Sequence, residues 1–130
     1  MSENMDYMGA IAKAILNSKE LQQLEWTQVS VVFEIDDDGY VTGTYGYAYD
    51  DAGEWSAVAP DIDEIEEPVV AYREWLRLDG DKGFMKMLFQ FDRENSKVNA
   101  DFEYEDSMRW NVTPANLDKI TQELRPNLGD

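Results

Sequence analysis

Two acidic clusters near the middle of the chain contain the side chains that could do chemistry. Their six carboxylates are Asp36, Asp37, Asp38, Asp50, Asp51 and Glu54. Because Ca²⁺ and similar cations bind several converging oxygen ligands, a metal site is the first hypothesis. The calcium-binding loop pattern fails, since counting from Asp36 places Tyr40 at the fifth position and Tyr47 at the twelfth, where oxygen ligands are needed. A tight Asp-Gly turn explains the first cluster without a ligand, so we predict no metal and no other cofactor.

The carboxylates also raise the hypothesis of glycosidase-like catalysis, in which one of two paired acids stays protonated in a buried site. With 28 acidic residues in the chain, pairs at any spacing arise by chance. The chain has no histidine and no cysteine, and its glycine-rich stretch at 43–53 lacks the lysine of a phosphate-binding loop. We predict that the protein is not an enzyme. The alternative is a carbohydrate-binding or carbohydrate-acting protein that uses Tyr45, Tyr47 and Tyr49.

The net charge of −17 is unevenly placed along the sequence. Residues 20–72 contain 14 acidic and no basic residues, whereas the other 77 residues contain 14 acidic and 11 basic ones. Such a segment repels phosphates, so nucleic acid and anionic membranes are disfavoured as partners and a cationic protein is favoured. The simpler alternative is that the acidity only keeps the protein soluble. Another alternative is a general acidic mimic of nucleic acid that binds many basic proteins.

The recognition hypothesis assigns partner contacts to the turn acids, to the acids that follow Pro60, and to exposed aromatic side chains. The candidate contacts are Asp36, Asp37, Asp38, Tyr40, Asp50, Asp51, Glu54, Trp55, Asp61, Asp63, Glu64, Glu66 and Glu67. Trp75 is a further aromatic candidate. For each aromatic residue the alternative is core packing, and for each acid it is an ordinary solvated surface.

Composition indicates one folded domain spanning residues 1–130. Hydrophobic residues make up 43% and aromatic residues 12% of the chain, more than a disordered acidic tail contains. Without cysteine, nothing requires an oxidising compartment. The first 20 residues intersperse acids and lysines among apolar residues, unlike a signal peptide, and no apolar run reaches membrane-spanning length. We therefore expect a cytoplasmic protein, of an oligomeric state that the sequence does not indicate.

Hydrophobic periodicity predicts a helix and then a hairpin in the first half of the chain. Apolar residues in 5–24 recur every three or four positions, which is typical of an amphipathic helix. Residues 27–35 alternate as a half-buried strand, and the Asp-Gly turn returns the chain along residues 40–49. One face of this return strand is predicted to carry Val41, Tyr45, Tyr47 and Tyr49. Residues 54–59 are a candidate for a short third strand.

The second half repeats this succession of helix and hairpin. Residues 61–80 form a helix candidate, although Pro68 favours a start one or two residues before it, with the proline in the first turn. Alternating apolar residues predict a second hairpin within 84–105. A last helix is predicted to begin with Thr113 as its cap and Pro114 in its first position.

The resulting order of elements is α-β-β-(β)-α-β-β-α. Strands joined by short turns pair antiparallel, and helices between hairpins must cover a face of the sheet. The sequence therefore predicts an α+β fold with a mainly antiparallel sheet of four to five strands and helices packed on it.

Three features together carry a family resemblance: the hairpin with its tyrosine-rich return strand, "KMLFQFDRENSKVNADFEYED" at 86–106, and Arg109-Trp110 before the last helix. In these features the chain resembles the YezG-like immunity proteins, bacterial antitoxins paired with polymorphic or contact-dependent growth inhibition toxins. The resemblance spans most of the chain as a pattern of aromatic residues and turns rather than as a strict motif.

The resemblance implies a small cytoplasmic α+β protein that binds and neutralises a cognate toxin domain, commonly a nuclease. It implies no catalytic residues and transfers no family contact set to this chain, so the acidic candidates rest on charge placement alone. Charge and resemblance lead to one expectation, which is non-covalent inhibition by occlusion of a basic toxin surface, with complementary charge supplying rate and specificity.

Overall fold

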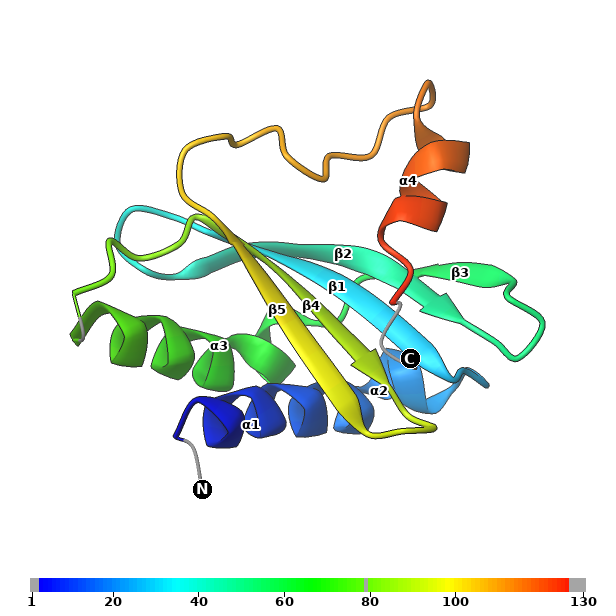
Figure 1. Ribbon diagram of the computed structural model, residues 1–130, viewed down its shortest axis with the longest axis horizontal. Helices are drawn as coiled ribbons and strands as arrows, with labels where there is room; N and C mark the ends of the chain where they lie inside the picture. The colour runs from blue at the N-terminus through cyan, green and yellow to red at the C-terminus, as the bar shows by residue number, and fades with distance from the viewer. Residues whose placement is uncertain (1–2, 79, 127–130) are drawn as a thin grey trace.

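The computed structural model describes residues 3–78 and 80–126, and its centre is a five-stranded antiparallel sheet (Figure 1). The strands are β1 (Gln28–Ile35), β2 (Val41–Tyr49), β3 (Trp55–Val58), β4 (Lys86–Asp92) and β5 (Lys97–Glu103). They are ordered β3-β2-β1-β4-β5, and every neighbouring pair is antiparallel. The predicted α+β fold is confirmed, including its short third strand.

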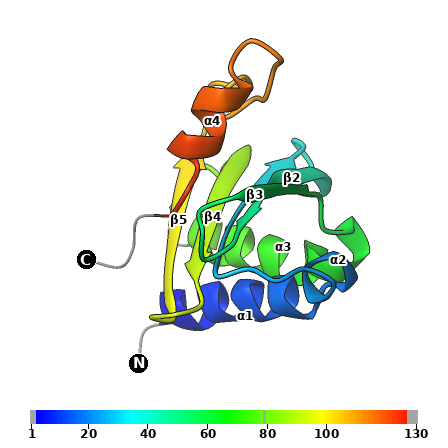
Figure 2. The ribbon, with the colours of Figure 1, turned by 90° about the vertical axis from the view of Figure 1, so that its right-hand side faces the viewer.

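Helices cover one face of the sheet. α1 (Glu3–Asn17) and α3 (Ile62–Leu78) lie side by side against it, and the short α2 (Lys19–Gln22) leads from α1 toward β1 (Figures 1 and 2). Their apolar sides and the strands share one core, whose fully buried members include Ile11, Ile15, Val29, Val31, Phe33, Ile65, Val69 and Phe89. None of the helices in the described ranges combines the length and apolarity needed to span a bilayer.

The C-terminal segment covers the other face. After β5 the chain crosses the sheet through residues 104–116 and continues into α4 (Leu117–Glu123), on the side opposite α1 and α3 (Figure 2). A second apolar cluster lies between α4 and the strands and contains Val32, Tyr47, Tyr49, Leu88, Ile120 and Leu124. The alternation in 27–35 predicts a half-buried strand, but Ser30 and Val32 on the second face of β1 are also fully buried, because of this cover.

The single helix predicted over 5–24 is broken at Ser18. This residue has extended backbone angles (φ −65°, ψ 145°), and its hydroxyl donates a 2.8 Å hydrogen bond to the carbonyl of Ile15. Such a side-chain bond to the backbone competes with continuation of a helix. Leu21 still reaches the core because α2 begins directly after the break.

α3 begins at Ile62, within the candidate range 61–80, so Pro68 lies inside the helix and the alternative start with the proline in the first turn is wrong. Ile65, which precedes the proline in sequence, and Val69, which follows it, are both fully buried. Packing of this face outweighs the one backbone hydrogen bond that a proline removes from a helix.

α4 begins at Leu117, later than the predicted start with Thr113 as cap. Thr113 instead closes a separate turn with Asn116. The N–H of Thr113 donates to Oδ1 of Asn116 at 2.7 Å, and the N–H of Asn116 donates to Oγ1 of Thr113 at 3.3 Å. This reciprocal pair has the pattern of a capping box, so Thr113 caps the single turn at 114–116 that precedes α4 rather than α4 itself.

A β-bulge beside the first turn changes the face that Val41 occupies. Glu34 pairs with Gly43 but Ile35 pairs with Val41, so β2 has one extra residue at this point. Val41 is therefore buried with Ile35 on the helix-covered face. The prediction that it shares a face with the tyrosines is wrong, because the bulge reverses the alternation.

Gly46 provides a direct test of how closely β2 and β1 approach. A Cβ atom at this position would lie 1.9 Å from the carbonyl oxygen of Ser30 and 2.8 Å from Cα of Val31, both backbone atoms of the central strand. We predict that Gly46→Ala lowers the free energy of unfolding by about 3 kcal/mol, measured by urea denaturation. The control is Gly9→Ala in α1, which has open space around it and should stabilise the protein by about 1 kcal/mol. Equal effects of the two variants would contradict the close approach.

Candidate protein-binding surface

The predicted acidic contacts lie along one side of the sheet and do not form a single cluster. The turn at 36–40 connects β1 to β2 and the turn at 50–54 connects β2 to β3, so they lie at opposite ends of the nine-residue β2 (Figure 1). At about 3.3 Å per residue, these ends are roughly 30 Å apart. No single metal or catalytic centre can use both turns, whereas a partner protein can contact both.

The acids around the start of α3 lie on the same side of the sheet. The hydroxyl of Thr44 donates a 2.6 Å hydrogen bond to the carbonyl of Pro60, and the N–H of Val41 donates a 3.1 Å bond to Glu66. These bonds hold the beginning of α3 beside the first half of β2, beyond the residues that β3 pairs with. The α3 acids are therefore placed between the two acidic turns.

Both acidic turns use their first aspartate in the same way. Oδ1 of Asp36 and Oδ1 of Asp50 each accept two backbone N–H groups, from the residues two and four positions further along, at 2.9 to 3.0 Å. The fourth turn residue is a glycine with positive φ, 90° at Gly39 and 82° at Gly53. These two carboxylates therefore form the turns. Glu64 and Glu66 likewise accept backbone N–H groups, from Lys19 and Val41.

The remaining predicted acids are exposed and have no hydrogen bond or ion pair to their side chains within the described residues. They are Asp37, Asp38, Asp51, Glu54, Asp61, Asp63 and Glu67, and we call this set the acidic edge. No lysine or arginine occurs in the segment from 20 to 72. Arg73 and Arg125 approach the glycines of the two turns, but in the described part of the chain neither forms an ion pair with these carboxylates. Their charges are available to a cationic partner.

Two of the three candidate aromatic side chains are accessible beside these acids. Tyr40 is 62% exposed in the first turn, and Trp55 is 39% exposed at the start of β3. Trp75 belongs to the interface of α1 and α3, where its ring stacks on Tyr7 at 5.2 Å and its Nε1 donates a hydrogen bond to Glu3. Tyr40 and Trp55 therefore remain the candidates for aromatic contacts.

Two basic side chains are buried inside the molecule, and two others stack on tryptophan rings at its surface. Lys86 is 2% exposed and Arg73 is 7% exposed, and Nε of Arg73 donates a 2.9 Å hydrogen bond to the carbonyl of Phe84. Arg93 and Arg109 each stack over a tryptophan ring, with the guanidinium carbon 4.3 Å from the ring centroid. Burial of Lys86 and Arg73 therefore lowers the number of basic side chains at the surface, whereas Arg93 and Arg109 remain exposed.

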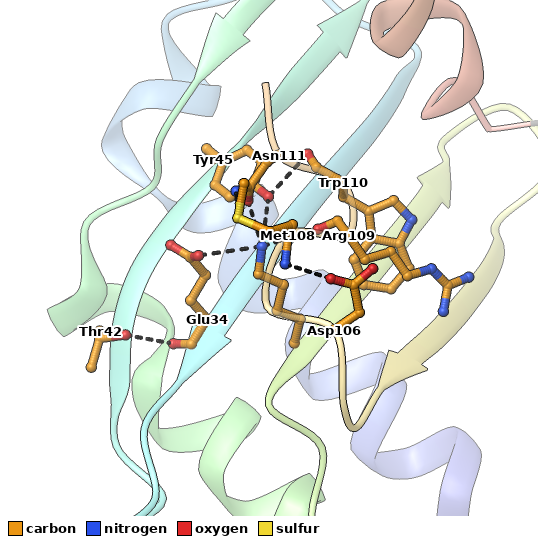
Figure 3. A network of polar contacts seen from close by, with 9 residues as sticks. Glu34, Thr42, Tyr45, Asp106, Met108, Arg109, Trp110 and Asn111 are labelled. Carbon is orange, nitrogen blue, oxygen red and sulfur yellow. Dashed lines mark hydrogen bonds and ion pairs between the residues drawn. The ribbon is translucent and has the colours of Figure 1, made fainter. Parts of the chain in front are cut away.

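Lys86 joins the sheet to the C-terminal segment. Its Nζ donates hydrogen bonds to the carbonyl of Arg109 at 3.0 Å and to Oδ1 of Asn111 at 2.6 Å, and it lies 3.5 Å from the carboxylate of Glu34. The residues around the ammonium group can be followed in Figure 3. The sequence does not reveal this role, because a lysine on the second face of a strand is ordinarily solvated.

Tyr45 and Trp110 complete this junction (Figure 3). The hydroxyl of Tyr45 donates a 3.0 Å hydrogen bond to the carbonyl of Trp110, and Trp110 has a φ of +66°. A bulky residue in this region costs on the order of 1 kcal/mol, so the surrounding contacts must hold it. Burial, assisted by the nearby Glu34 carboxylate, raises the pKa of Tyr45, which keeps the phenol protonated as a donor.

Tyr47 and Tyr49 are buried under the C-terminal segment. They share an apolar cluster with Ile120 and Leu124, and the hydroxyl of Tyr49 donates a 2.7 Å hydrogen bond to the carbonyl of Thr121. Burial raises the pKa of Tyr49 to about 12. These rings are therefore part of the core and do not line an exposed aromatic groove of the kind that sugars bind.

Glu103 anchors the beginning of the same C-terminal segment. One carboxylate oxygen accepts the N–H groups of Tyr104, Glu105 and Asp106, and the other accepts a 3.0 Å bond from Arg109. The backbone donors of Asp106 and Glu105, followed by Arg109, lower the pKa of Glu103 to about 2. This single carboxylate therefore directs the chain from β5 across the sheet.

No protein-family model matches the chain, and a search of the curated proteins finds no match. Function is therefore inferred from the side chains themselves.

Replacement of Lys86 tests the junction between sheet and C-terminal segment. We predict that Lys86→Met lowers the free energy of unfolding by about 3 kcal/mol, because the carbonyl of Arg109 and the amide oxygen of Asn111 lose a charged donor. Chemical denaturation measures the change. Lys82→Met is the matched control, since its ion pair with Glu105 is exposed and 3.9 Å long, and it should change stability by less than about 0.5 kcal/mol. Similar values for both lysines would rule out the junction.

Titration of Glu103 tests the anchor. Because its folded-state pKa lies below the ordinary 4.5, its charged form favours the fold, and this stabilisation is lost as the pH falls from about 4.5 to about 2. Side-chain carboxyl resonances followed by NMR should show a midpoint near 2 in the folded protein. Arg109→Met should raise the midpoint but leave it below 4.5, since the backbone donors remain. A midpoint of 4.5 in the unmodified protein would show that the backbone bonds do not form.

Proposed function

We propose that the protein is an immunity protein, an antitoxin that binds and neutralises a cognate bacterial toxin domain with a basic surface, such as a nuclease. The observation that carries this proposal is the acidic edge, in which exposed carboxylates without internal partners line one side of the sheet. The resemblance to YezG-like immunity proteins points to the same function. A cytoplasmic place of action goes with it, because the protein protects the cell that makes the toxin.

The proposed mechanism is occlusion without covalent chemistry. Carboxylates of the acidic edge take the positions that phosphates occupy in a nuclease groove, and Tyr40 and Trp55 supply apolar contacts. Exposed charges act over about 8 Å at physiological ionic strength, so the attraction mainly accelerates encounter. The short-range contacts then determine how long the complex lasts.

The proposal is tested by expressing the protein together with the toxin domain encoded beside its gene. Co-purification of the two chains, loss of toxicity and a salt-sensitive affinity are expected. An excess of an unrelated basic protein of similar charge should not displace the toxin, which separates a specific inhibitor from a general acidic mimic. Persistent toxicity without a complex would overturn the proposal.

Neutralisation of the α3 part of the acidic edge tests the role of charge. We predict that Asp61→Asn, Asp63→Asn and Glu67→Gln combined slow association with the toxin by about tenfold at low salt, measured by stopped-flow fluorescence. Amides preserve helix capping and side-chain shape. The control combines Asp6→Asn, Asp118→Asn and Glu123→Gln, which change the net charge equally outside this segment and should alter the rate by less than about twofold. Equal slowing by both triple variants would show that only net charge matters.

A further inference from the structure

β3 is an edge strand whose outer side is unpaired. β2 pairs with it on one side, and no strand in the described ranges lies on the other. Trp55, Ser56 and Ala57 are all exposed. In Figure 2 this edge of the sheet faces the viewer, with α4 above it and the helical layer below.

The hairpin register determines which backbone groups face outward. The N–H of Asp50 bonds to the carbonyl of Glu54 at 3.0 Å, so these residues form a hydrogen-bonded pair at the closed end of the β2–β3 hairpin. Bonded and non-bonded pairs alternate along an antiparallel ladder. Counting along the register therefore makes Trp55 and Ala57 non-bonded positions, whose N–H and C=O groups point away from β2.

The residue after β3 agrees with this alternation. Ala59, two positions beyond Ala57, donates its N–H outward to the carboxylate of Glu20 in α2 and not to β2. Within the described part of the chain, no such acceptor or donor meets the outward groups of Trp55 and Ala57. The edge therefore offers two donors and two acceptors at the spacing of a strand.

The two edges of the sheet are not protected equally. β5, at the opposite edge, carries charged residues within the strand, namely Lys97, Asp101 and Glu103. Charged side chains on an edge strand discourage pairing with other chains. β3 has no charged residue and no proline between Trp55 and Val58, so its shortness is its main protection.

We propose that β3 accepts an extended segment of the toxin that carries lysine or arginine, which adds to the sheet as a sixth strand. This inference rests on the proposed immunity function and specifies how the partner is held. Members of the acidic edge flank both ends of β3, with Asp51 and Glu54 before it and Asp61 and Asp63 after it. Backbone bonds supply affinity in such strand addition, and alternate side chains supply specificity. Here the specificity is for positive charge.

A second copy of this chain is a poorer occupant than a cationic segment. Each copy has a net charge of −17, and pairing two β3 edges would bring the same acids together. Like charges directly opposite each other destabilise a strand pair, whereas basic side chains are attracted at both ends of the edge.

Amide hydrogen exchange by NMR tests the proposal on the complex with the toxin domain encoded beside the gene. The amides of Trp55 and Ala57 should exchange freely in the isolated protein and slow by on the order of tenfold or more in the complex. Ser56 and Val58 donate to β2 and should be protected in both states. A complex without this change would overturn the strand addition alone, whereas failure to form any complex would overturn the immunity function with it. Protection that appears in the isolated protein only at high concentration would assign the edge to a second copy and overturn the proposal.

A pair of variants at Ala57 provides an independent test. Ala57→Pro removes the outward N–H without removing a bond to β2, a place where edge strands tolerate proline. It should reduce toxin affinity by about tenfold while the circular dichroism spectrum stays unchanged. Ala57→Thr keeps the N–H and should bind within about threefold of the unmodified protein. Unchanged affinity of the folded proline variant would overturn the proposal, and if that variant does not fold, the exchange measurement decides.

Discussion

The rest of the structure depends on the burial of β1 from both faces. Val29, Val31 and Phe33 meet the helical layer, while Ser30 and Val32 are equally inaccessible on the other side. A central strand with apolar residues on both faces needs a covering layer on each face. Without it, the valine side chains of β1 and the tyrosine rings of β2 would lose the free energy that burial provides. The segment after β5 supplies the second layer. Its attachment has to satisfy the polar groups of the sheet as well as cover the apolar ones.

This second layer accounts for the charge distribution. Lys86 and Arg109 are engaged where the C-terminal segment meets the sheet, and Arg125 donates to Gln28 at the other end of that segment. These side chains donate to carbonyl, amide and carboxylate oxygens, Lys86 from a buried position and the two arginines from exposed ones, and a charged hydrogen bond is stronger than a neutral one. The segment 20–72 contains no basic residue, and most of its acids at the turns and at the start of α3 are exposed. Segregation of charge in the sequence thereby becomes segregation on the surface.

Local patterns in the sequence predict the strands and hairpins well because the interactions that form them are local. The Asp-Gly turn, the alternation in 86–103 and the acids at the start of α3 each act within a few residues. The features that the patterns miss depend on distant contacts: the reversal of Val41 by a bulge, the continuation of α3 through Pro68, and the burial of Lys86. One clue was present, since three tyrosines on the second face of β2 are too apolar for a solvated surface. The residues of the acidic edge could be predicted from the sequence. That its two turns lie at opposite ends of β2 could be known only from the order of the strands in the sheet.

An open sheet edge and a large negative charge are each unfavourable for a small protein, yet together they limit each other's effects. An unpaired edge invites pairing with any extended chain, including another copy of the same protein. A net charge of −17 opposes that self-association, because the acids that flank β3 would face one another. The same charge attracts only strands of opposite sign, so it restricts which chains can pair with β3. Non-specific backbone pairing can thereby become selective without any pocket shaped for one side chain. In the proposed immunity function, charge at the two ends of this four-residue strand excludes segments that are not basic, and short-range contacts must distinguish the toxin from other basic proteins.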